Sequence, residues 1–294
     1  MVAPAGESAT LVADIFVKGR PSMASRVHLI SGLPRSGSTL LSALLRQNPR
    51  FSAAMSSPVA ELCGVLLQKM SGASEFASFF SDDRRATIVR SVFDAYYAHI
   101  TKDQVIFDTN RTWTSKTALL KTLYPEARII CCVRPVSWVI DSIERQVRQN
   151  ALQPSRLFGY KSGGTVYSRV ETLMNSETGL IGLAWSSLRE AWFSEGADRL
   201  LVVDYDRLVS APEQTIARLY LELGEAPFAH DFENVAYDEP DYDAQLGIPG
   251  MHKVRPKVEA RKRESCLPPD LFAKYADTNF WLNPKMNLRG VTIL

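Results

Sequence analysis

The residues best suited to chemistry lie in one short loop, residues 32–39, with the sequence Gly-Leu-Pro-Arg-Ser-Gly-Ser-Thr. Its two glycines have the spacing of the phosphate-binding loop Gly-x-x-x-x-Gly-Lys-[Ser/Thr], in which backbone N–H groups and the start of the next helix hold a phosphate. Ser38 stands where that loop has lysine, and Arg35 supplies a cation instead. The loop is therefore predicted to bind an anion without the lysine that reaches the β- and γ-phosphates of a nucleoside triphosphate.

A second anion site is predicted about a hundred residues further along the chain. Arg134 ends an apolar stretch, and Ser142 follows eight residues later in a predicted helix. A guanidinium offers a two-pronged fork to phosphate oxygens, and the serine hydroxyl can face the same side. The later predicted strands end in Arg134 and in Asp204-Tyr205, without an obvious magnesium-binding acid. A nucleotide carrying two separate phosphate-like groups fits this pattern better than ATP with Mg²⁺.

Near-continuous apolar strands that alternate with helices surround these residues. Their order predicts an α/β fold, a P-loop-like parallel sheet flanked by helices on both faces, with a C-terminal wrapping segment. Strands are predicted near residues 27–30, 51–55, 104–107, 127–133 and 200–203, and helices near 40–48, 58–70, 84–100, 115–123, 137–149 and 208–223. We expect residues 1–24 to be a flexible extension and residues 25–294 to be one domain.

Composition narrows the possible classes of function. The 294 residues include 34 Lys and Arg against 32 Asp and Glu, a net charge of +2, so no general attraction to nucleic acid is expected. The four cysteines, Cys63, Cys131, Cys132 and Cys266, lack metal-binding spacing and are predicted to be reduced thiols, with no metal bound. No apolar run reaches the ~18 residues of a membrane span. Since no signal pattern starts the chain, a cytoplasmic location is predicted.

Three segments together resemble the sulfotransferases that use PAPS (3′-phosphoadenosine 5′-phosphosulfate). Residues 33–41 resemble the 5′-phosphosulfate loop, in the Pro-Arg-Ser-Gly form of tyrosylprotein and bacterial enzymes rather than the Pro-Lys-Ser-Gly form of the cytosolic small-molecule enzymes. Arg134 and Ser142 resemble the 3′-phosphate site, although Pro135 stands where the family often has Asp. Residues 201–208 resemble a strand whose following tyrosine, here Tyr205, can line the nucleotide site.

The resemblance implies a set of nucleotide-binding residues, with PAPS as donor and PAP, its desulfated form, as product. Lys253 and Arg255 fall where such enzymes have a mobile segment that closes over the nucleotide, whereas residues 261–263, Arg-Lys-Arg, are expected to be solvated. The implied binding residues are Pro34, Arg35, Ser36, Gly37, Ser38, Thr39, Arg134, Ser142, Tyr205, Lys253 and Arg255.

The catalytic assignment leaves alternatives open. Arg35 is expected to stabilise the leaving group. Relatives often carry lysine at the place of Thr109, so Arg111 is either its substitute or part of a surface salt bridge. Asp108, which ends a predicted strand, and Glu61, early in a helix, are equal candidates for the base that takes the acceptor's proton. His252 is a further candidate for the base, and His28 is expected in the core.

Two other functions remain open from the sequence, a P-loop kinase-like phosphotransferase and a non-catalytic nucleotide-binding protein on the same fold. For the leading hypothesis, the expected acceptor is a small molecule, a glycan or a peptide, sulfated on a hydroxyl or amine. Its pocket is expected to lie among residues 56–70, 152–167 and 231–250. A homodimer is compatible with the sequence, which otherwise says nothing of oligomeric state.

Overall fold

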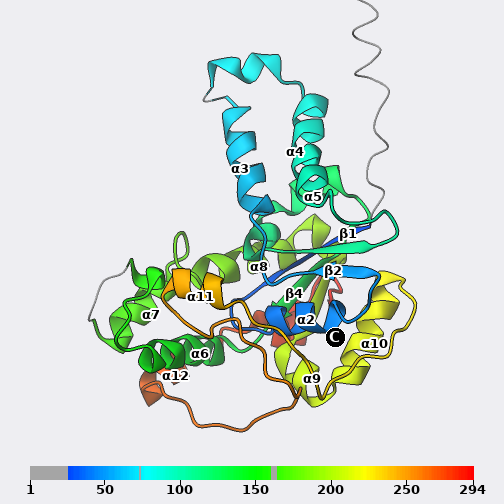
Figure 1. Cartoon of the computed structure of the whole chain (residues 1–294). Coiled ribbons are helices and arrows are strands. Elements are labelled where there is room, and N and C mark those ends of the chain that lie inside the picture. Colours follow the sequence, from blue (N-terminus) through cyan, green and yellow to red (C-terminus); the bar gives the residue numbers. More distant parts are fainter. Residues whose placement is uncertain (1–25, 73, 160–163) are drawn as a thin grey trace, which may run out of the picture.

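The computed structural model of the chain describes residues 26–72, 74–159 and 164–294. The predicted N-terminal extension, residues 1–24, lies outside these residues, as does part of the predicted acceptor segment 152–167. The described part is a twisted parallel sheet with helices on both faces, and the chain after α10 wraps back over it (Figure 1). The predicted fold class is confirmed.

Six parallel strands form the sheet, in the order β2-β3-β1-β4-β5-β6. The strands are β1 (Val27–Gly32), β2 (Phe51–Ala53), β3 (Val105–Thr109), β4 (Ile129–Val133), β5 (Leu200–Asp204) and β6 (Thr292–Ile293). The five predicted strands are all present, whereas β6 has only two residues and gives no pattern that a sequence could reveal. Because β1 lies between β3 and β4, their carboxyl ends meet at one edge of the sheet.

Alternate residues of the strands enter two separate cores. In β4, Ile129, Cys131 and Val133 face one core while Ile130 and Cys132 face the other. The adjacent cysteines are thus buried on opposite faces. The first core lies under α3 (Val59–Lys69), α4 (Asp82–Tyr96), α5 (Thr117–Leu123), α6 (Val136–Gln149), α7 (Val166–Met174), α8 (Gly182–Phe193) and α12 (Pro269–Lys274), and the second under α2 (Ser38–Leu45), α9 (Tyr205–Ser210) and α10 (Pro212–Leu223).

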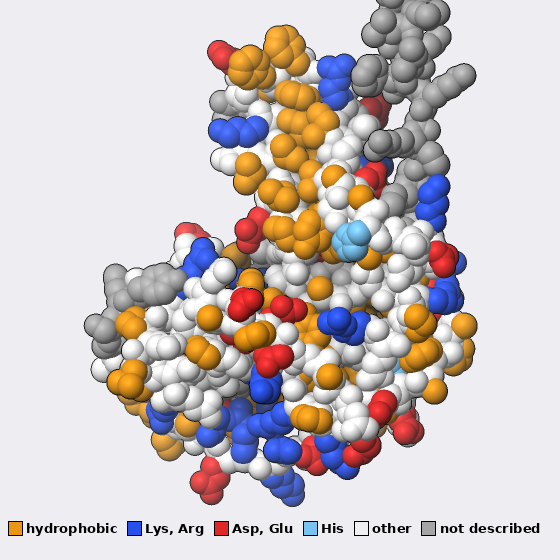
Figure 2. Space-filling view, viewed as in Figure 1, with side chains coloured by type: hydrophobic (Ala, Val, Ile, Leu, Met, Phe, Trp, Pro, Cys, Tyr) orange, Lys and Arg blue, Asp and Glu red, His pale blue; other side chains and the backbone are white. Residues whose placement is uncertain are grey.

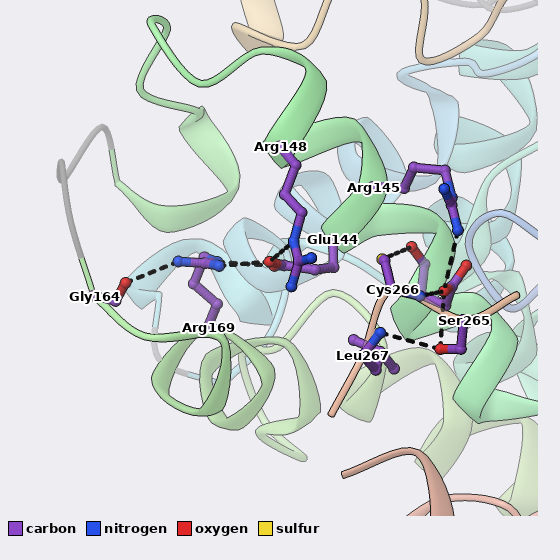
Figure 3. A network of polar contacts seen from close by, with 9 residues as sticks. Glu144, Arg145, Arg148, Gly164, Arg169, Ser265, Cys266 and Leu267 are labelled. Carbon is purple, nitrogen blue, oxygen red and sulfur yellow. Dashed lines mark hydrogen bonds and ion pairs between the residues drawn. The ribbon is translucent and has the colours of Figure 1, made fainter. Parts of the chain in front are cut away.

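The helix α6 anchors two segments that are distant in the sequence. Glu144 is buried and accepts hydrogen bonds from Arg148 Nε at 2.9 Å and from Arg169 Nη2 at 2.6 Å, which fastens α7 to α6 (Figure 3). Asp141, one turn earlier, accepts from the Ser265 hydroxyl at 3.0 Å and from the Cys266 N–H at 2.7 Å. These bonds fasten the C-terminal segment to the same helix.

The C-terminal segment is held at several further points. Residues 232–237 and 254–258 run beside one another, with Val235 N–H donating to Pro256 O at 2.7 Å and Val258 N–H donating to Phe232 O at 2.8 Å. Between these two stretches the chain forms the short helix α11 (Pro240–Leu246). The predicted wrapping segment is therefore present, and it carries α11 to the carboxyl edge of the sheet.

His28 is a buried histidine in the middle of β1, as the sequence predicts. Its Nδ1 accepts the backbone N–H of Arg128 at 3.0 Å, and its ring lies 5.6 Å from that of Phe107. Burial, with smaller contributions from Arg26 and Arg128, lowers the pKa of His28 from 6.5 to about 4. The folded protein thus holds His28 neutral, and protonation would remove the hydrogen bond to Arg128.

A group whose pKa is depressed by folding stabilises the folded state above its unfolded pKa, and this contribution is lost as the pH falls from 6.5 towards 4. We predict that wild type loses about 2–3 kcal/mol more of its unfolding free energy between pH 7 and pH 4.5 than His28→Gln does. Urea denaturation of both proteins at the two pH values measures this difference. Equal losses in the two proteins would show that His28 is not held neutral.

Candidate active site

The phosphate-type loop between β1 and α2 depends on glycine at both ends. Gly32 has φ 102°, and a Cβ there would lie 2.2 Å from the carbonyl oxygen of Cys132 in β4. Gly37 has φ 92°, and its Cβ would lie 2.9 Å from the ring of Tyr205. Arg35 adopts the left-handed φ of 58°, which is uncommon for a residue with a side chain. The loop is therefore wound tightly against β4 and α9.

The inner surface of this loop is a set of free donors. Among the described residues, the backbone N–H groups of residues 36–39 have no hydrogen-bond partner, because they precede or begin α2. Helix starts of this kind favour anions. Of the predicted loop residues, Pro34 and Arg35 shape the turn, while Ser36, Gly37, Ser38 and Thr39 present their N–H groups.

The Arg35 side chain joins the loop to two distant segments. Its Nε donates to the Ser142 hydroxyl in α6 at 3.3 Å, and its Nη1 donates to the backbone carbonyl of Met251. The two predicted anion sites are thus adjacent, since Ser142 belongs to the second one. The C-terminal segment contacts the same guanidinium.

Arg134 stands directly after β4, with its guanidinium 4.2 Å from the centre of the Tyr205 ring. Its Nε is buried and has no hydrogen-bond partner among the described residues. A buried N–H of a cation is costly to leave unpaired, so a ligand that accepts from it would bind with a corresponding gain. The structure therefore brings Arg134, Ser142 and Tyr205 together with the loop.

Arg263 is a third cation at this place. The sequence-based expectation that it is solvated is wrong: its side chain is only 28% exposed, pairs with the fully buried Asp141 and lies 5.0 Å from the ring centre of Trp138. No motif marks it, because Asp141 and Trp138 become its neighbours only through the wrap. Arg261 is solvent-exposed, as expected.

We call Arg35, Arg134 and Arg263 the arginine cluster. Burial is the main cause that lowers the pKa of Arg35, and the charges of Arg134 and Arg263 lower it further. The pKa of Arg134 is lowered in the same way, by burial and then by Arg263. The three guanidinium groups thus repel one another, and an anion bound among them would relieve that repulsion. Lys253, 3.7 Å from Asp238, and Arg255 are both exposed.

Asp108, one candidate for the base, is enclosed at the end of β3. It is 0% exposed and accepts from the Ser57 hydroxyl at 2.6 Å, the Tyr97 hydroxyl at 2.7 Å and Trp113 Nε1 at 2.6 Å. Burial raises its pKa, while the three hydrogen bonds act in the opposite direction. Asp108 therefore ties together β3, the start of α3, α4 and the turn η2 (Arg111–Lys116).

Glu61 and Arg111 are both exposed to solvent. Glu61 is exposed in the first turn of α3. The pKa of Arg111 is lowered by burial and raised by Tyr242 and Glu61. Among the described residues Arg111 makes no ion pair within 4.0 Å and no side-chain hydrogen bond, which does not support the surface salt bridge.

His252 forms a pair with Asp243 of α11. The Asp243 carboxylate is 0% exposed, accepts the backbone N–H of His252 at 2.8 Å, and lies 2.5 Å from its ring Nδ1. Since a carboxylate only accepts, Nδ1 carries the proton and Nε2 is the nitrogen with a free lone pair. Burial lowers the pKa of His252, Asp243 raises it, and Arg35 and Arg111 lower it. The free nitrogen, Nε2, is therefore the atom of His252 that could accept a proton.

The enclosure of Asp108 gives a testable stability effect. An amide has one acceptor oxygen, so Asp108→Asn leaves at least one of its three donors unsatisfied and should lower the unfolding free energy by about 2–3 kcal/mol. Glu61→Gln, at an exposed position, should change it by less than about 0.5 kcal/mol. Urea denaturation of both variants compares them. A fully stable Asp108→Asn protein would contradict a structural role for this carboxylate.

No helix among the described residues is long and apolar enough to cross a membrane. Within the same residues, no group of three or more His, Cys, Asp or Glu side chains is placed to hold a metal ion.

Solved structures with similar folds include three bacterial sulfotransferases. The sulfotransferase domain of the Synechococcus PCC 7002 olefin synthase is 19% identical, with 86% of this chain and 94% of that chain covered and a TM-score of 0.47. The Alicyclobacillus acidocaldarius sulfotransferase is 14% identical, with 76% of this chain and 89% of that chain covered and a TM-score of 0.46. A Mycobacterium avium sulfotransferase is 13% identical, with 90% of this chain and 80% of that chain covered and a TM-score of 0.44. These distant similarities add no evidence on activity. No curated protein matches the chain.

The model of the sulfotransferase family matches residues 29–229, which is more than half of the chain. The match begins in β1 and runs beyond α10, so it includes the loop, Arg134, Ser142 and Tyr205. The chain therefore belongs to the sulfotransferase family and is an enzyme of sulfuryl transfer.

Proposed function

We propose that this enzyme transfers the sulfuryl group of PAPS to a hydroxyl acceptor and releases PAP, and that the residues gathered at the carboxyl edge of the sheet carry out this reaction. One observation carries the proposal: the buried, unpaired Nε of Arg134 lies within a cluster of arginines beside the loop. Two separate anion sites, one at the loop and one at Arg134, suit a nucleotide with phosphates on both its 5′ and 3′ positions.

In this proposal each of the two anion sites binds one of the two phosphate groups of the nucleotide. The free N–H groups of residues 36–39, with the hydroxyls of Ser38 and Thr39, hold the 5′-phosphosulfate. Arg134 and Ser142 hold the 3′-phosphate, and Arg263 adds charge from the C-terminal segment. Tyr205 packs against Arg134 and fixes the plane of its guanidinium. Lys253 and Arg255 are exposed in this structure, and closure of their segment over the nucleotide stays a prediction.

Transfer requires the acceptor oxygen to form a bond to sulfur while the bond from sulfur to the bridging oxygen of the nucleotide breaks. Negative charge then grows on the departing 5′-phosphate. Arg35 and the loop N–H groups are already in place to stabilise that charge, which is the condition for effective electrostatic catalysis. Arg111, on the acceptor side and unpaired among the described residues, supplies a second positive charge near the moving sulfuryl group.

We assign the general base to His252, with Asp243 as the residue that orients it. The acceptor's proton passes to Nε2, while the Nδ1–H···Asp243 bond fixes the ring and stabilises the resulting imidazolium. Met251, the preceding residue, binds Arg35 through its carbonyl, which keeps His252 beside the phosphosulfate loop. Asp108 is closed to ligands, so its role is structural. Glu61 is accessible and is best placed to contact the acceptor.

The kinase-like alternative is not favoured. Ser38 replaces the lysine that such enzymes use on the β- and γ-phosphates. The acid at the end of β5, Asp204, is engaged in capping α9, where it accepts from the N–H groups of Asp206 and Arg207. Family membership also disfavours a protein without activity. A cytoplasmic location, a homodimer, and the boundary at residue 25 stay predictions.

The nucleotide site is tested by calorimetric binding of PAP and of ATP with Mg²⁺. We predict micromolar or tighter binding of PAP, with ATP weaker. Arg134→Ala should raise the Kd of PAP by about 10- to 100-fold, because it removes charge-assisted hydrogen bonds. Arg261→Ala is the matched control, since Arg261 is exposed and its ion pair among the described residues is with Glu259. The proposed site would be wrong if ATP bound more tightly than PAP, or if Arg134→Ala and Arg261→Ala changed the Kd of PAP equally.

The base is tested by the pH dependence of turnover, followed as PAP release with the best acceptor from a panel of phenols, sugars and alkanols. His252→Gln should lower kcat by about 10²- to 10⁴-fold without changing the Kd of PAP. Because the pKa of His252 is below 6.5, wild-type kcat/KM should be flat at neutral pH and fall only below it.

Asp243→Asn provides the second arm of this test. It removes a carboxylate that raises the pKa of His252, so the fall in kcat/KM should move to still lower pH. Asp108→Asn is the comparison, because it should lower the unfolding free energy and leave the pH dependence of kcat/KM unchanged. An unchanged kcat in His252→Gln, together with a large loss in Glu61→Gln, would assign the base to Glu61 instead.

A further inference from the structure

The helices α3 and α4 form a hairpin that stands away from the body, joined by the turn η1 (Glu75–Phe79) (Figure 1). Large apolar side chains are exposed along it, and in Figure 2 they form a continuous column from its tip to the body. Four large apolar residues of the hairpin are exposed, and we call them the hairpin stripe: Leu62 (46% exposed), Val65 (55%), Phe76 (55%) and Phe79 (64%).

The hairpin stripe is distinct from the residues that hold the hairpin together. Those are Cys63, Met70, Val89 and Phe93, which are buried between α3, α4 and the sheet. The rings of Phe76 and Phe79 lie 6.1 Å apart, so these two exposed side chains form one patch rather than isolated contacts. Apolar side chains gathered in this way mark a surface that binds something.

The hairpin stripe leads into the proposed active site. Leu62 directly follows Glu61 in the first turn of α3. Just before this helix, the carbonyl of Ser57 accepts a hydrogen bond from Nδ2 of Asn110, the residue next to Arg111, at 3.1 Å. From Glu61 to the end of α3 at Lys69 the helix rises about 12 Å. The stripe is therefore an apolar track that starts where the acceptor's reacting group must lie and extends away from the nucleotide.

The charges around the track indicate what occupies it. Residues 69–85 carry three acidic side chains, Glu75, Asp82 and Asp83, against three basic ones, Lys69, Arg84 and Arg85. This tip has no positive excess to attract an anionic bilayer. The two arginines also donate to carbonyls of the hairpin itself, at Phe79, Met70 and Ala77. A second copy of the chain seated on the stripe would cover Glu61, beside which the acceptor must enter.

We propose that the acceptor is a single-chain amphiphile, a hydroxylated alkyl or acyl chain, whose apolar tail lies along the hairpin stripe while its hydroxyl reaches His252. This inference rests on the proposed sulfuryl transfer and names the substrate class of that site. The tail replaces water on Leu62, Val65 and the two phenylalanines, and the polar end lies between Glu61, Arg111 and His252. Longer tails thus bind more tightly without altering the chemical step.

The test uses 1-butanol, 1-hexanol, 1-octanol and 1-decanol as acceptors, with saturating PAPS and PAP release as the readout. In wild type each added methylene should lower KM by about two- to fourfold, since burying a methylene contributes about 0.8 kcal/mol at most, while kcat stays constant. In Val65→Asp this dependence on chain length should largely vanish. Leu221→Asp is the matched control, because Leu221 is 77% exposed on α10, outside the hairpin.

A second measurement separates binding from turnover. Decanol added to the PAP-bound protein should shift the methyl NMR signals of Leu62 and Val65, and the shifts should be absent with butanol at the same concentration. A KM independent of chain length, a dependence that survives in Val65→Asp, or unshifted methyl signals overturns the proposal. A wild-type dimer that Val65→Asp dissociates, by sedimentation velocity, makes the stripe an interface between copies instead. Failure of PAP to bind would refute the nucleotide site itself.

Discussion

Mutual repulsion among three buried or half-buried guanidinium groups is the constraint on which this site depends. Arg35, Arg134 and Arg263 come from a loop, a strand end and the C-terminal segment, and burial as well as their shared charge works against keeping them together. Two fully buried carboxylates oppose this cost: Asp141 pairs with Arg263, and Asp243 lies near Arg35. The fold therefore keeps three guanidinium groups close together, and an anion bound among them would relieve their repulsion.

The C-terminal wrap is what completes the site. The sheet and the helix α6 supply Arg134 and Ser142, but Met251, His252 and Arg263 arrive from residues more than a hundred positions away. Asp141 holds this segment through Ser265 and Cys266, and Arg35 holds it through Met251. The same contacts that fix the segment also set His252 beside the loop. The segment that carries His252 is therefore held directly by Arg35 of the loop.

Local patterns in the sequence predict the parts of the candidate site that depend on neighbouring residues. A strand, two spaced glycines and a helix predict the loop, and Arg134 with Ser142 can be found because β4 and α6 are adjacent in the chain. The role of Asp108 could not be found in this way. A carboxylate at a strand end can face a ligand or the interior. Asp108 faces the interior because it accepts hydrogen bonds from three separate segments, through Ser57, Tyr97 and Trp113.

The same limit applies to His252 and Arg263, whose partners, Asp243 and Asp141, are set by tertiary packing and not by spacing.

The crystal structure of the enzyme with PAP tests the central claim most directly. We predict that one phosphate lies on the N–H groups of residues 36–39 and the other between Arg134, Ser142 and Arg263, with Nε of Arg134 donating to it. A second phosphate that points into solvent, away from the arginine cluster, would contradict the account.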